Sequence, residues 1–166
     1  PDHHLITRWL SLTIKNNMLK YCKSKITGTF TVSQLELFIE DSGIPPTFGG
    51  KLIEPKSRSV ESRLDAWGSV RPPEIVTVEG GFVDLFTTCY PPVDMICELS
   101  KQLNQTVRMF YYEIGADCAG ELTTSNGRIK HGIEHTVSNH SPTFRSDFVR
   151  LMEFVEKHFP EETNKQ

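Results

Sequence analysis

The sequence predicts an α+β fold, a two-layer sandwich in which a mostly antiparallel sheet has its helices packed on one face. Three observations lead to this prediction. Several segments alternate apolar and polar residues with the period of a strand, Gly-Gly or Asn-Gly pairs separate some of them, and two longer segments repeat apolar residues with the period of a helix.

The N-terminal part of the chain predicts one strand and two short helices. Apolar and polar residues alternate within Leu5–Ile14, which predicts the first strand. An apolar stripe over 18–28 predicts a short helix. Ser33 and Glu36 have the spacing of a capping box, so we expect a second short helix that ends near Gly43.

A long connection follows over about 44–73. It contains two Pro-Pro pairs, a Gly-Gly pair and a polar stretch, which are typical of turns and loops. Connections of this length are either functional or flexible. We expect a single domain over 1–166 with this connection inside it and a loose C-terminal tail at about 160–166.

The next segment carries clearer signals. Two strands are predicted at 75–78 and 82–90, separated by a glycine pair, and a helix over about 92–104 has one apolar side. Apolar residues occur on both faces of the following strand, 106–114, so we expect it to lie in the centre of the sheet.

The C-terminal part predicts a hairpin and a long helix. Segments 121–124 and 128–137 flank Asn126-Gly127, and Asn-Gly is the strongest short hairpin signal. Six apolar residues at helical spacing then predict a helix over 144–159.

Composition excludes some classes of function. The formal charge of −3 gives no global attraction to nucleic acid, so binding through the lysines near the N-terminus is the weakest hypothesis. No apolar run is long enough to span a bilayer, and no secretory leader is recognisable, so we expect no membrane partner and a cytoplasmic location.

Pro1 suggests that the chain begins at its natural start, since an initiator Met is normally removed before Pro. The four cysteines lack the close pairing of zinc or redox motifs, so we expect reduced thiols.

Several short motifs together resemble one known family. They occur in the order Leu64–Gly68, Phe86–Pro92, Tyr111–Glu113 and Ala119–Gly120. This order is similar to that of the YubB-like family of phage and plasmid proteins, although Ser69 and Val70 stand where that family has Thr-Lys-Trp.

The resemblance implies a ferredoxin-like domain and an accessory protein of a mobile element that acts in the cytoplasm of a bacterial host cell. It points to non-enzymatic binding of a protein partner, including the inhibition of a host defence complex. No cofactor is expected, and the identity of the partner and the oligomeric state stay open.

The expected partner-binding residues are Asp65, Trp67 and Arg71, which lie in the long connection. Large aromatic side chains and arginines are common anchors of protein interfaces. The alternative for Trp67 is packing against the edge of the sheet.

The alternative function is a metal-assisted hydrolase or a small-ligand-binding enzyme that uses Glu113, Asp117, His131 or His135. The two histidines are four residues apart on a predicted strand, about 13 Å, which is too far to share one ion. The carboxylates match no calcium loop. We therefore expect no catalytic residue and no metal site.

Overall fold

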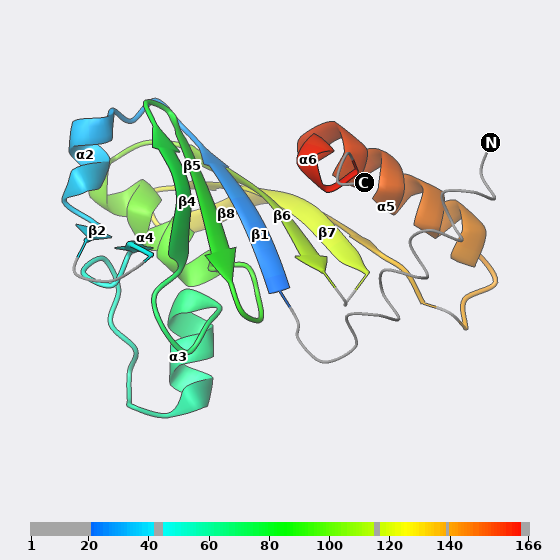
Figure 1. The fold of residues 1–166 in the computed structure, drawn as a ribbon, viewed down its shortest axis with the longest axis horizontal. Coiled ribbons are helices and arrows are strands. Elements are labelled where there is room, and N and C mark those ends of the chain that lie inside the picture. The colour runs from blue at the N-terminus through cyan, green and yellow to red at the C-terminus, as the bar shows by residue number, and fades with distance from the viewer. Residues whose placement is uncertain (1–20, 42–44, 115–116, 139, 164–166) are drawn as a thin grey trace.

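The computed structural model describes residues 21–41, 45–114, 117–138 and 140–163, and within them the chain forms one eight-stranded antiparallel sheet (Figure 1). The strand order is β2-β3-β4-β5-β1-β6-β7-β8. The strands are β1 (Tyr21–Thr27), β2 (Ile39–Glu40), β3 (Thr47–Phe48), β4 (Glu74–Glu79), β5 (Phe82–Thr87), β6 (Val107–Ile114), β7 (Cys118–Ser125) and β8 (Arg128–Thr136). The helices are α2 (Val32–Glu36), α3 (Val60–Trp67), α4 (Val93–Gln102), α5 (Phe144–His158) and α6 (Pro160–Thr163).

This architecture contradicts the predicted ferredoxin-like two-layer sandwich, because the sheet has too many strands and carries helices on both faces. Tyr111 and Tyr112 of β6 belong to two different hydrophobic clusters. The cluster of Tyr111 includes the buried residues of α4, and the cluster of Tyr112 includes Leu151 and Val155 of α5. Adjacent residues of a strand point to opposite faces, so α4 and α5 lie on opposite sides of the sheet.

The segment predicted as a helix over 18–28 is instead, from residue 21 on, the central strand β1. Cys22, Ser24 and Ile26 are buried and alternate with the less buried Lys23 and Lys25. This is the period of a strand. Hydrogen bonds to β5 on one side and to β6 on the other place β1 in the middle of the sheet.

The other N-terminal predictions had mixed outcomes. The strand expected at 5–14 lies outside the described residues. The helix expected from Ser33 is the shorter α2, and its capping box is formed by Thr31 and Gln34, not by Ser33 and Glu36. The connection over 44–73 contains β3 and α3.

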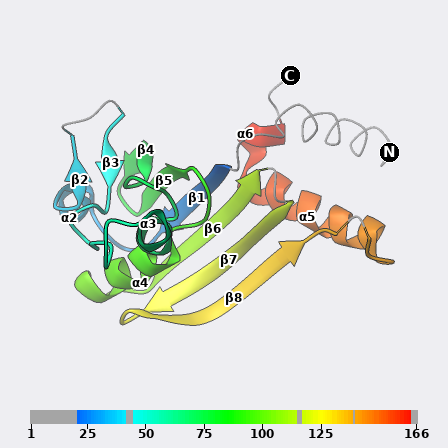
Figure 2. The ribbon, with the colours of Figure 1, turned by 90° about the horizontal axis from the view of Figure 1, so that it is seen from below.

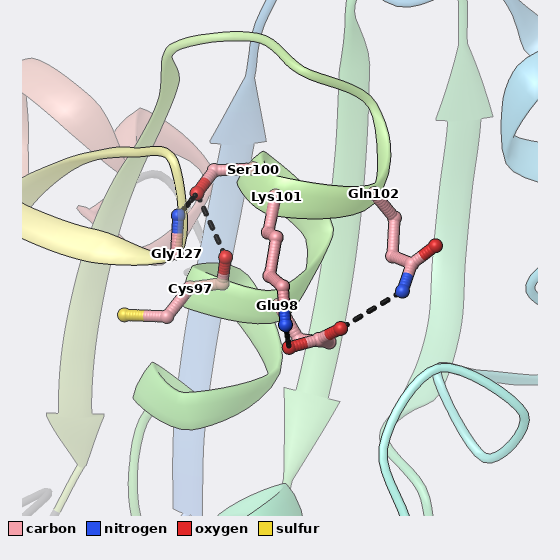
Figure 3. A network of polar contacts seen from close by, with 6 residues as sticks. All are labelled: Cys97, Glu98, Ser100, Lys101, Gln102 and Gly127. Carbon is pink, nitrogen blue, oxygen red and sulfur yellow. Dashed lines mark hydrogen bonds and ion pairs between the residues drawn. The ribbon is translucent and has the colours of Figure 1, made fainter.

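The predicted helix over 92–104 and the Asn-Gly hairpin are confirmed as α4 and as the turn between β7 and β8. Asn126 and Gly127 both have positive φ, 51° and 75°, as a tight hairpin turn requires. Figure 3 shows how the turn is attached to α4: the Gly127 N–H donates to Ser100 Oγ at 3.0 Å, and Ser100 Oγ–H donates to the Cys97 carbonyl at 2.7 Å. The hairpin is therefore fixed against one end of the helix.

Candidate partner-binding groove

Helix α3 positions the candidate site, and its own ends are well defined. Ser59 caps the N-terminus by accepting a hydrogen bond from the Ser62 backbone N–H at 3.2 Å. At the C-terminus Gly68 adopts a left-handed conformation with φ of 69°, and its N–H donates to the Leu64 carbonyl at 2.8 Å. The helix packs against α4 (Figure 1).

The residues after α3 are attached to the loop that follows β5. The Tyr90 N–H donates to the Gly68 carbonyl at 2.9 Å, and a Cβ on Gly68 would collide with the carbonyl oxygen of Tyr90. Ser69 Oγ lies 2.7 Å from Thr88 Oγ1 and accepts the Thr88 N–H at 3.2 Å. These contacts hold the C-terminal end of α3, and with it Trp67, in a fixed place.

Trp67 has a structural contact of its own. Its indole Nε1–H donates to the Ile53 carbonyl at 2.9 Å, which joins α3 to the preceding connection. The side chain is half-buried, so part of the ring still faces outward. Trp67 therefore has a structural contact within the fold and also lines a groove.

The groove has a volume of about 600 Å³ and lies between β2, the connection before α3, and the residues just after α3. Trp67 and Val70 contribute apolar surface. The charged residues that line it are three arginines and two glutamates: Arg58, Arg63, Arg71, Glu40 and Glu54.

The arginines differ in their partners. Arg71 forms an exposed ion pair with Glu74, with 3.5 Å between Nη2 and Oε1. Within the described part of the chain, neither Arg58 nor Arg63 forms an ion pair. Their guanidinium groups can therefore donate paired hydrogen bonds to a carboxylate that enters the groove.

The structure brings together two of the three residues expected to bind a partner. Trp67 and Arg71 both line the groove, whereas Asp65 is exposed on α3 and is not among the lining residues. The sequence did not predict Arg58 and Arg63 as site residues, because they lie in or beside a polar, serine-rich stretch that is typical of a solvated loop.

The four candidates for a metal or hydrolytic site are not brought together. Glu113 lies opposite Cys118 and shares a face of the sheet with Tyr111. His131 and His135 lie opposite Thr123 and Ala119, on the other face. Asp117 has a positive φ of 48° before β7, and burial raises the pKa of its carboxyl. Among the described residues, no group of three His, Cys, Asp or Glu side chains could hold a metal ion.

His135 instead packs against a helix, with its ring 5.2 Å from that of Phe154 of α5. The two buried thiols also lack the environment of a nucleophile. Burial raises the pKa of Cys22 and of Cys118 to about 12, and for Cys118 the nearby carboxylates of Glu113 and Glu134 add to the effect. Neither thiol forms an appreciable amount of thiolate near neutral pH.

A smaller cavity of about 290 Å³ lies between the sheet and α6. Its charges are partly paired within the protein, since Lys25 Nζ is 3.1 Å from Glu161 Oε1. Asp84 also lines it, and its buried Oδ1 has no hydrogen-bond partner among the residues that the structure describes. Burial raises the pKa of this carboxyl, and the positive charge of Lys25 opposes the effect.

In comparisons with protein-family models, with curated proteins and with solved structures, no match to this chain is found. The similarity to the YubB-like family therefore stays a prediction. Each helix in the described ranges is too short or too polar to cross a bilayer.

Proposed function

We propose that this protein is a non-enzymatic binding protein and that the groove beside α3 binds an acidic segment of a partner protein. The observation that carries the proposal is that one groove is lined by Trp67 and by two arginines, Arg58 and Arg63, that form no ion pair with any described residue. A half-buried Trp supplies apolar contact area at little entropic cost, and arginines supply paired donors for carboxylates.

The charge balance of the groove favours a protein segment over nucleic acid. Three arginines face two glutamates, so the lining carries only a small positive excess. A phosphate backbone would require many basic contacts, and the whole chain has a formal charge of −3. A segment with a few carboxylates beside an apolar residue fits this balance better.

The biological setting is a separate part of the proposal. An origin in a phage or plasmid, and action against a bacterial host defence complex, rest only on the resemblance of the motifs. The groove is compatible with any partner that presents an acidic segment.

The test is selection of binding peptides from a displayed random library on the immobilised full chain. We expect enrichment of peptides with Asp or Glu near an apolar residue. A double reversal, Arg58→Glu with Arg63→Glu, should weaken their binding tenfold or more, since it replaces two donors by two repelling charges. The enriched peptides should also bind less tightly as salt is raised.

The matched control is Lys51→Glu with Lys56→Glu, which changes the net charge equally at two exposed residues outside the groove lining. This variant should lose much less affinity than the groove variant, because its two charges lie beside the groove and make no direct contact with a peptide in it. Circular dichroism and the melting temperature check that both variants fold. If no acidic peptides are enriched, or if both double variants bind equally well, the groove is not the binding site.

A further inference from the structure

Within the described residues, the strand β8 forms a long free edge of the sheet. It is the last strand in the sheet order, and it pairs with β7 on one side only (Figure 2). Along its nine residues all side chains are exposed except the half-buried His135. Within the described part of the chain, the outer backbone groups of β8 have no strand partner, so they are free to pair with another strand.

Gly132 lies near the middle of this edge, and the fold of the single chain does not require a glycine there. Its φ is not positive, and an added Cβ would meet only ordinary contacts, the nearest being the Glu121 carbonyl oxygen at 3.7 Å. Glycine weakens a strand interior, and one of its established uses there is to let another backbone approach closely.

Opposite charges lie symmetrically around Gly132. Lys130 is two residues before it and Glu134 two residues after it. If β8 pairs antiparallel with β8 of a second copy and Gly132 lies opposite Gly132, each Lys130 lies opposite a Glu134. The two-fold symmetry repeats this pair, which gives two favourable cross-strand pairs.

The faces of the side chains agree with this register. Gly132 and Glu134 lie opposite Leu122 and Gly120 of β7, on the face that carries α4. Regular alternation back along β8 places Lys130 on the same face. The register shift between Thr123 and Thr124 leaves Lys130 as the extra residue of a bulge, so regular pairing with β7 ends at His131.

Two neighbouring registers are less favourable. Pairing centred on His131 would set Ile129 opposite Ile133, but the bulge places these side chains on opposite faces, since they lie opposite Thr124 and Glu121 of β7. Pairing centred on Ile133 sets His131 opposite His135 and forms no pair of opposite charges.

We propose that the protein forms a symmetric dimer in which the two β8 strands pair antiparallel about Gly132 and join the two sheets into one. The interface is isologous, with the Lys130 to Glu134 contact made twice. It is independent of the groove beside α3.

The experiment is sedimentation analysis of the full chain across a wide range of concentration. We expect a concentration-dependent dimer of the wild type. Lys130→Glu alone and Glu134→Lys alone each place like charges opposite one another twice, so each should raise the dimer dissociation constant about tenfold or more. An equimolar mixture of the two variants should form a heterodimer of near wild-type strength, because opposite charges then face each other again.

Two controls separate pairing from other effects. Arg128→Glu makes the same charge change beyond the bulge and should leave the dimer intact. Tyr111→Phe removes the hydrogen bond that the Tyr111 hydroxyl donates to Glu134 Oε2 at 2.6 Å, and it should also leave the dimer intact.

Three results would overturn the proposal. The first is a wild type that stays monomeric at every concentration. The second is a dimer that Lys130→Glu does not weaken. The third is a mixture of folded Lys130→Glu and Glu134→Lys chains that fails to restore the dimer.

Discussion

The substitution Gly68→Ala should destabilise the protein strongly, because a Cβ is unfavourable at this residue for two separate reasons. The residue is in the left-handed region, with φ of 69°, which costs a non-glycine residue about 1 kcal/mol. The new methyl group would also collide with the carbonyl oxygen of Tyr90, and the backbone shift that relieves such crowding costs about 1–3 kcal/mol. The sum is a loss of about 2–4 kcal/mol, or about 5–15 °C in melting temperature for a domain of this size.

The matched control is Gly80→Ala. This glycine does not have a positive φ, and an added Cβ would meet no described atom within 4 Å. Alanine there should be neutral or should stabilise the protein by up to about 1 kcal/mol, because it restricts the unfolded chain. Urea and thermal unfolding of the two variants beside the wild type measure both effects. Equal stability of the Gly68→Ala variant and the wild type would refute the reasoning, and so would equal losses in both variants.

Three further outcomes are expected. Cys22 and Cys118, with pKa values raised to about 12, should resist alkylation at neutral pH until the chain unfolds, and mass spectrometry of native and denatured samples checks this. Asp84→Asn should raise stability at neutral pH by about 1 kcal/mol, because it removes a buried charge whose Oδ1 accepts no hydrogen bond from the described residues. The pKa of the Asp84 carboxyl is raised in the folded state, so its contribution to the free energy of unfolding is complete below the unfolded pKa of about 4 and is lost as pH rises through the folded pKa. Urea titrations at several pH values should therefore show that the Asn variant is more stable than the wild type at neutral pH and that this difference disappears in acid. Phe159→Ala should cost about 3–5 kcal/mol by calorimetry, since the side chain is fully buried, whereas Leu37→Ala, at 70% exposed, should change stability by less than about 0.5 kcal/mol.

The parts of the fold that were predicted correctly carry strong local signals. Helix α4 has an apolar stripe along one side, and the turn at Asn126-Gly127 requires positive φ at two consecutive residues. Such signals act over a few residues, so a single sequence contains them in full. The apolar residues on both faces of β6 likewise predicted a strand inside the sheet, and β6 lies between β1 and β7.

The error at β1 has a physical cause. Tyr21–Thr27 alternates buried and less buried positions, but its buried set includes Ser24, and its outward positions include two lysines that also fit a solvated helix face. The difference in hydrophobicity between the two sets of positions, which would distinguish a strand from a helix, is therefore weak. The contacts with β5 and β6 decide the conformation, and these partners are distant in sequence.

The residues of the candidate site were likewise predicted only where the signal is local. Trp67 and Arg71 stand out because their side chains suit interfaces wherever they occur. Arg58 and Arg63 became part of the candidate site only through the fold, because α3 and the preceding connection bring them beside Glu40 of β2. No local sequence pattern predicts that these residues lie close together.

The two proposed surfaces do not compete for the same part of the molecule. The groove includes a residue of β2 at one edge of the sheet, and β8 is the opposite edge, with six strands between them in the sheet order. A dimer joined through β8 would therefore keep both grooves open and would place them toward the outer ends of the combined sheet. A partner that presents two acidic segments could engage both grooves, and the second contact would then be intramolecular, which raises the overall affinity without any new contact. Free β edges are normally a risk of aggregation, and pairing two of them in a closed two-fold arrangement removes that risk while it doubles the number of binding sites.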